Sequence, residues 1–169
     1  MVITIEIREY SHRHGKELLS LTHPVEYNEI TNLLQITPHY DHGFMKGYTP
    51  KHYLADKFLE IGWAKEVEIP LGTGKSDYCD LEKNKIFIEQ EYSRFEMFFR
   101  DFFRFLLLYN ERKLDVGVII TYDETAFQNW GPDVNSYKSA RASLGKLIDF
   151  LQGKYATVVE VPIWCIGIE

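Results

Sequence analysis

The chain has 169 residues, of which 45% are hydrophobic and 15% aromatic, and it carries a formal net charge of −6. This much apolar material is enough for the core of one compact domain, so we expect residues 1–169 to form a single domain. The acidic balance argues against a protein that binds nucleic acid without regard to sequence, because such binding comes mainly from Lys and Arg. The two cysteines lie far apart and are typical of free thiols.

The ends and apolar runs of the chain bear on its location. Residues 1–6 place no basic residue before their apolar ones, so no secretory signal is expected. No apolar run approaches the roughly 20 residues that a membrane-spanning helix needs. We therefore expect a cytoplasmic protein with no membrane partner.

Strand and helix patterns alternate along the chain. Alternating apolar and polar residues predict a strand over 2–7, followed by a polar turn over 11–16. Helical spacing of apolar residues predicts helices over 24–36 and 49–60, the second with Thr-Pro at its start. The later predicted elements are a strand over 64–69, a hairpin over 76–81 and 85–91, an aromatic helix over 94–108, a buried strand over 116–120, a helix over 136–151 and a last strand over 157–168.

Acidic residues gather on the predicted hairpin. Asp77 and Asp80 lie on its first strand, and Glu89 and Glu91 follow the apolar run of its second strand. Side chains alternate along a strand, so Glu89 and Glu91 point to the same face. With an aspartate from the neighbouring strand they could hold Mg²⁺, which proteins bind through one or two carboxylates and the phosphates of a substrate. Taken alone, the same pattern is also common on solvated strands.

Three separated blocks of sequence occur together in a characteristic order. They are Tyr10-Ser11-His12 with Gly15; Asp77-Tyr78, Ile88-Glu89-Gln90-Glu91 and Asp115-Val116-Gly117-Val118; and Val161-Pro162-Ile163-Trp164-Cys165-Ile166-Gly167-Ile168. In this order they resemble the type II restriction endonucleases of the BstYI and BglII kind, in the PD-(D/E)xK nuclease superfamily. The resemblance implies an α/β, restriction-endonuclease-like three-layer domain with a central mixed β-sheet flanked by helices. It also implies a Mg²⁺-dependent, sequence-specific endonuclease that hydrolyses double-stranded DNA.

The resemblance assigns roles to the hairpin carboxylates. Asp77 matches the first metal ligand, Glu89 the second, and Glu91 the third position, where the wider superfamily has a lysine. Glu91 would then orient or deprotonate the attacking water, or bind a second metal. The stretch between Asp77 and Glu89 is about two residues longer than in relatives, so Asp80 is the alternative ligand if the hairpin has a different register.

Further site residues are expected outside the hairpin. Lys51 and His52, in the first turn of the second helix, are auxiliary candidates that could contact the phosphate. Arg100 and Arg104 are expected as surface partners of Glu96 and Asp101. The polar segment 123–143 is the candidate DNA recognition surface, since its side chains can read base edges in the major groove; the residues concerned are Asn135, Ser136, Lys138, Ser139 and Arg141. An ordinary loop followed by a helix is the alternative there.

The resemblance also implies a homodimer, because two active sites related by a two-fold axis suit a palindromic target, here with a GATC core by family analogy. The helices around 24–36 and 49–61 are the candidate contacts. Two rival hypotheses stay open: a catalytically silent DNA- or protein-binding module on a nuclease fold, and a nuclease with another task, such as repair or nicking. A zinc site at His12, His14, His39 and His42 is a weaker alternative, because their spacing fits no common ligand pattern.

Overall fold

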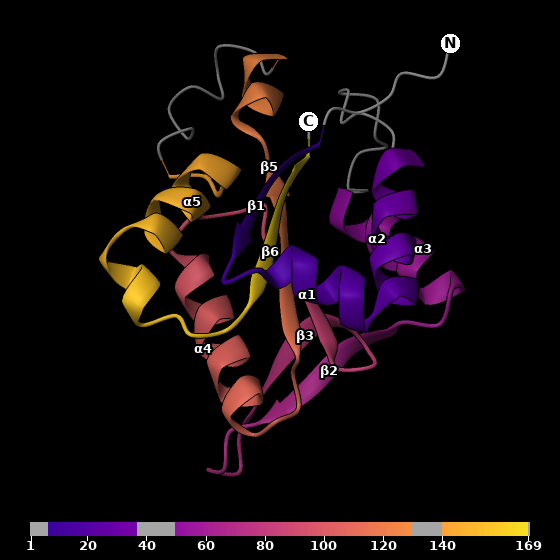
Figure 1. The fold of residues 1–169 in the computed structure, drawn as a ribbon, viewed down its shortest axis with the longest axis vertical. Coiled ribbons are helices and arrows are strands. Elements are labelled where there is room, and N and C mark those ends of the chain that lie inside the picture. Colours follow the sequence, from indigo (N-terminus) through magenta and orange to yellow (C-terminus); the bar gives the residue numbers. More distant parts are fainter. Residues whose placement is uncertain (1–6, 37–49, 130–139, 169) are drawn as a thin grey trace.

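The computed structural model describes residues 7–36, 50–129 and 140–168 (Figure 1). These residues share one six-stranded sheet in the order β1-β6-β5-β4-β3-β2. Strands β4, β5 and β6 run parallel, and the outer strands pair antiparallel with their neighbours, so the sheet is mixed. The strands are β1 (Arg8–His12), β2 (Ala64–Pro70), β3 (Ser76–Lys83), β4 (Ile86–Gln90), β5 (Val116–Tyr122) and β6 (Ile163–Ile168).

Helices cover both faces of this sheet (Figure 1). One side carries α1 (Gly15–Thr22), α2 (Pro24–Ile36) and α3 (Pro50–Glu60), and the other carries α4 (Met97–Asn110) and α5 (Leu144–Gln152). The described residues also include two 3₁₀ helices, η1 (Glu124–Asn129) and η3 (Lys154–Thr157). None of the helices in the described ranges has the length and apolar character needed to cross a membrane. The predicted three-layer α/β architecture is confirmed.

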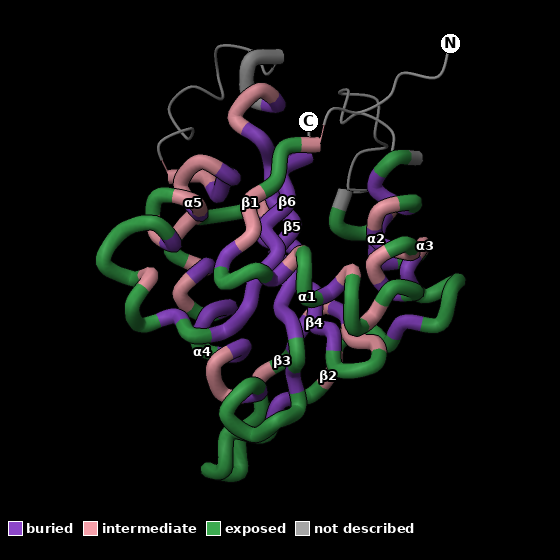
Figure 2. Tube along the Cα trace, viewed as in Figure 1, coloured by how far each residue is buried: buried purple, intermediate pink, exposed green. Residues whose placement is uncertain are grey.

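The core consists of two apolar clusters, one on each face of the sheet. The central strands β5 and β6 are buried throughout (Figure 2). Strand β5 is buried along its whole length because helices cover both of its faces, as its unbroken apolar run predicts. On the α4 face the ring of Phe105 lies directly over Gly117, where an added Cβ would come within 2.5 Å of the ring. This close approach seats α4 against β5. Both cysteines are buried free thiols.

Several predicted boundaries are wrong. Strand β1 extends through Ser11 and His12, which were expected in a turn, and helix α1 follows it unpredicted. The helix expected over 136–151 begins at Leu144, because backbone hydrogen bonds from Phe95 N–H to the Ala140 carbonyl (3.1 Å) and from Ala142 N–H to Ser93 (3.3 Å) hold the preceding residues extended.

Two further elements start later than expected. The last strand begins at Ile163 rather than 157, since η3 and Pro162, which has no N–H to donate, precede it. Helix α4 begins at Met97 rather than 94, because Arg94 takes part in a β-bridge with Arg141. The strand expected over 2–7 lies almost wholly outside the described residues.

Candidate functional site

The β3–β4 hairpin is paired near its turn and opens toward its other end. The ladder of backbone partners stops at Leu81 and Ile88. Beyond that point the side chain of Asp80 takes the place of a backbone partner, since its Oδ2 accepts the N–H of Gln90 at 2.8 Å. The carboxylate of Asp80 therefore lies in the gap between the two strands.

A cation from α3 meets Asp80 in this gap. Lys51 Nζ lies 2.8 Å from Asp80 Oδ2 and donates to the carbonyl oxygen of Gln90 at 3.3 Å. Lys51 and His52 lie in the first turn of α3, and both line a small cavity of about 110 Å³ beside Asp80; its other lining residues are Ala55, Lys65, Glu66 and Gln90. The structure thus brings both predicted auxiliary residues to Asp80.

Glu89 occupies the buried side of the same open end, with 3% of its surface exposed. Its Oε1 accepts a hydrogen bond from Arg104 Nη1 at 3.0 Å. Burial, together with the negative charge of Asp80, raises the pKa of Glu89 to about 7, although the cations Arg104 and Lys51 oppose the shift. A carboxyl group with so perturbed a pKa beside a second carboxylate is typical of a functional site.

Asp77 has a different partner. Arg104 donates to both of its carboxylate oxygens, from Nε at 2.8 Å and from Nη2 at 2.5 Å. These hydrogen bonds lower the pKa of Asp77. Because the guanidinium of Arg104 also bonds Glu89, it fills the place where Asp77 and Glu89 come together. These two carboxylates are bridged by a side-chain cation.

Asp101 is a further buried carboxylate at this end of the hairpin. It lies one turn before Arg104 on α4, and its Oδ1 is 3.4 Å from Arg104 Nη1. Among the described residues its Oδ2 has no hydrogen-bond partner. Burial, with the charges of Glu89 and Glu91 nearby, raises the pKa of Asp101 well above its ordinary value. The α4 side of the site is therefore a dense acidic cluster around one guanidinium.

Glu91, the predicted third position, is buried and turned back onto its own chain. Its Oε1 accepts the N–H of Ser93 at 2.7 Å and also the Ser93 hydroxyl. Within the described ranges no group of three or more His, Cys, Asp or Glu side chains is arranged to hold a metal ion. The pair Asp80 and Glu89 still suits Mg²⁺, which binds one or two carboxylates and completes its shell with water and substrate phosphate.

Arg104 is the residue that sequence reasoning misjudged. It was expected on the surface, but only 7% of its side chain is exposed, and besides Asp101 it pairs with Asp77 and Glu89. Glu96 pairs instead with Arg94, at 2.9 Å. The available signal was a charged pair set within the stripe of aromatic residues that α4 buries. A charge at a buried helical position requires a partner in the core.

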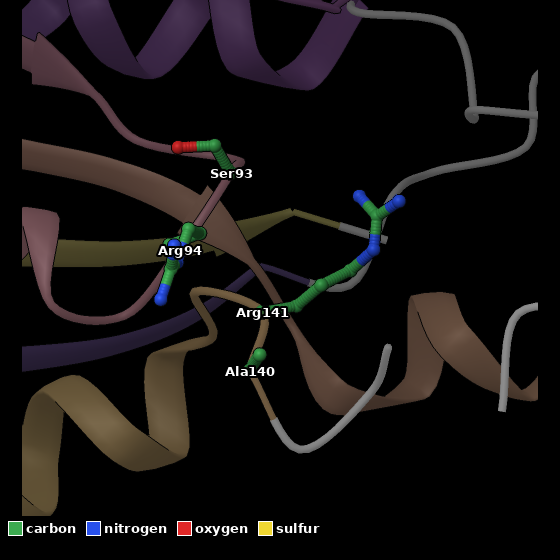
Figure 3. Close-up of a pocket in the computed structure, with 4 residues that line it drawn as sticks. All are labelled: Ser93, Arg94, Ala140 and Arg141. Atoms are coloured by element: carbon green, nitrogen blue, oxygen red, sulfur yellow. The ribbon is translucent and has the colours of Figure 1, made fainter. Parts of the chain in front are cut away.

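Of the predicted recognition residues, only Arg141 is described; the others, Asn135, Ser136, Lys138 and Ser139, lie outside the described residues. Arg141 forms its bridge to Arg94 beside a pocket of about 500 Å³ that Ser93 and Ala140 also line (Figure 3). The side chains of Arg94 and Arg141 extend in different directions (Figure 3). The pocket begins two residues after Glu91, so the end of the candidate recognition segment adjoins the open end of the hairpin.

His12 has a structural contact. It is buried, and its Nε2 lies 2.7 Å from the carbonyl oxygen of Val159, to which it donates. Burial lowers the pKa of His12. His39 and His42, the other half of the alternative zinc site, lie outside the described residues.

Comparison with known proteins gives a consistent answer. The family model of restriction endonuclease BglII/BglIII matches residues 7–168. A crystal structure of BglII complexed with a DNA 16-mer is similar, with a TM-score of 0.73 at 17% identity over 98% of this chain and 76% of that one. Free BglII has a TM-score of 0.65 at 18% identity, over 99% and 80% of the two chains. No curated protein matches.

Proposed function

The chain belongs to the BglII/BglIII family of restriction endonucleases, which are type II site-specific deoxyribonucleases, and we propose that it hydrolyses double-stranded DNA with Mg²⁺ bound by Asp80 and Glu89. The observation that carries this proposal is the open end of the β3–β4 hairpin, where Asp80 interrupts the ladder beside the buried Glu89. The similarity to BglII in complex with DNA supports DNA as the partner.

Asp80 is a better ligand candidate than Asp77 because of their partners. Asp77 is held on both oxygens by a buried guanidinium, and displacing it would leave Arg104 without its main partner. Asp80 uses Oδ2 for its contacts, while Oδ1 has no hydrogen bond among the described residues. Its charge also acts directly on Glu89. Asp80, rather than Asp77, is therefore our candidate for the first metal ligand.

Different residues of the site would have different roles in hydrolysis. A bound divalent cation would polarise the phosphate and lower the pKa of a bound water. Asp80 and Glu89 would bind that cation, and Arg104 fixes the orientation of Glu89. Glu91 would orient the attacking water once its carboxylate leaves Ser93. Lys51 and His52 line the cavity in which the phosphate would be neutralised.

A homodimer, a palindromic target and a cytoplasmic location complete the proposal. Apolar side chains are exposed on the two predicted contact helices and next to them, with Leu21 at 80%, Val25 at 60% and Leu59 at 42% exposure. A dimer contact at α2 and α3 would remove this surface from water. For target recognition we propose the segment that ends at Arg141, with a GATC core as the first sequence to test.

The test is digestion of an unmethylated plasmid that holds many candidate sites. Discrete fragments are expected with Mg²⁺, and they should disappear with EDTA and with Glu89→Gln. Glu160→Gln, the same change at an exposed glutamate away from the site, is the matched control and should cut normally.

Other results of the digestion would redirect the proposal. DNA that is retained but not cut with any divalent metal would indicate a silent binding module. On a plasmid with one site, a persistent nicked circle would indicate a nicking enzyme rather than a dimer that cuts both strands.

A further inference from the structure

Two cations reach the open end of the hairpin, and they differ in how firmly they are held. Arg104 enters from α4, is 7% exposed and bonds three carboxylates. Lys51 enters from α3, is 46% exposed and bonds one carboxylate, that of Asp80. A guanidinium so buried is a fixed part of the structure, whereas a half-exposed ammonium on a flexible stem can leave its partner at little cost.

The position of the Lys51 ammonium is that of a bound cation. It lies 2.8 Å from Asp80 Oδ2 and 3.3 Å from the Gln90 carbonyl oxygen, so two oxygens of the open hairpin end coordinate it. Both are hard oxygen ligands of the kind that Mg²⁺ prefers. A divalent ion bound to Asp80 would therefore compete with Lys51 for the same carboxylate.

The cavity around Lys51 offers the ammonium a second place to bind. Lys51, His52 and Lys65 supply basic side chains to its wall, against the carboxylates of Asp80 and Glu66. If a metal neutralises Asp80, the remaining cations favour an anion in this cavity. A phosphodiester oxygen of the DNA is the anion that the family's substrate provides.

We propose that Lys51 is an exchangeable cation of the active site: it holds Asp80 in place before metal binds, is displaced by the divalent ion, and then contacts the scissile phosphate. The inference rests on the proposed function and deepens it. The wider superfamily has a lysine at the third strand position, where this chain has Glu91. Under the inference, Lys51 of α3 makes the phosphate contact instead. It also predicts opposite effects on metal binding and on cleavage when Lys51 is removed.

The experiment compares Lys51→Met with Lys65→Met in the full chain. Both changes remove one positive charge from the same cavity, but only Lys51 contacts Asp80. Mn²⁺ affinity is measured without DNA, from the spectrum of free Mn²⁺ in electron paramagnetic resonance. Lys51→Met should bind Mn²⁺ about fivefold more tightly or better, because its competitor is gone. Lys65→Met should stay within about twofold, since screened surface charges act weakly.

Cleavage at saturating Mg²⁺ should change in the other direction. Lys51→Met should cut at least about tenfold more slowly, although it binds the metal ion more tightly. Circular dichroism confirms that both variants fold.

Unchanged or weaker Mn²⁺ binding by Lys51→Met would overturn the inference. So would an equal gain in both variants, which would reflect overall charge alone. If wild-type protein binds no Mn²⁺ but cuts DNA, only this inference fails; if it neither binds Mn²⁺ nor cuts, the proposed function fails with it.

Discussion

Asp77 and Asp80 are three residues apart on β3, but their surroundings differ in almost every respect. Asp77 is held on both oxygens by the buried Arg104 of α4. Asp80 lies in the gap between β3 and β4, where it contacts the exposed Lys51 and a backbone N–H. The first arrangement is typical of a structural ion pair and the second of a site that can accept a ligand. The position of an aspartate along β3, rather than its residue type, therefore decides whether its carboxylate is available to a metal ion.

The largest expected difference is in catalysis. Asp80→Asn should reduce cleavage by at least about 1,000-fold, because losing a metal ligand removes several kcal/mol of transition-state stabilisation. Asp77→Asn should reduce it by less than about tenfold, since it leaves Asp80, Glu89 and Lys51 in place. Rates are measured on one plasmid at saturating Mg²⁺. If the two variants exchange these effects, Asp77 rather than Asp80 is the metal ligand.

A smaller difference is expected in stability, and it tests the pairing of Arg104 with the buried carboxylates. Arg104→Met should lower the free energy of unfolding by about 3 kcal/mol or more, because it leaves those carboxylates without their cation. Arg100→Met, on the exposed side of the same helix, is the control and should change it by about 0.5 kcal/mol or less. Urea unfolding monitored by circular dichroism measures both. Equal and small losses would mean that the guanidinium is not the counter-charge of this cluster.

The smallest expected effect is a pH dependence that belongs to Asp77. Its pKa is lowered in the folded chain, so its contribution is present above the unfolded value of about 4 and is lost as the pH falls below that value. The difference in unfolding free energy between wild type and Asp77→Asn should therefore be constant above about pH 5 and shrink in more acidic solution. Because Asp77 is partly exposed, we expect less than about 1 kcal/mol. A difference that grew on acidification would contradict the Arg104 pairing.

Local patterns in the sequence were sufficient for the hairpin, for β5 and for α2, because alternation and helical spacing depend on near neighbours. They also predicted Glu89 and Glu91 as site carboxylates, of which the structure turns Glu91 back onto Ser93. The family resemblance is confirmed. The hydrogen-bond partner of each carboxylate could not be predicted from these local patterns. Asp77 and Arg104 are 27 residues apart, and only the packing of α4 on the sheet brings them together. The end of the ladder at Leu81, which frees Asp80, likewise depends on how β3 separates from β4.

The contact between Phe105 and Gly117 has a consequence for how mutations in this enzyme are interpreted. Phe105 follows Arg104 in the chain, and its ring rests on backbone that has no side chain to hold it away. The apolar contact between Phe105 and Gly117 therefore helps to position the Arg104 guanidinium that orients Glu89. A genetic screen for loss of restriction should therefore recover substitutions at the buried Gly117 as well as at the acidic residues.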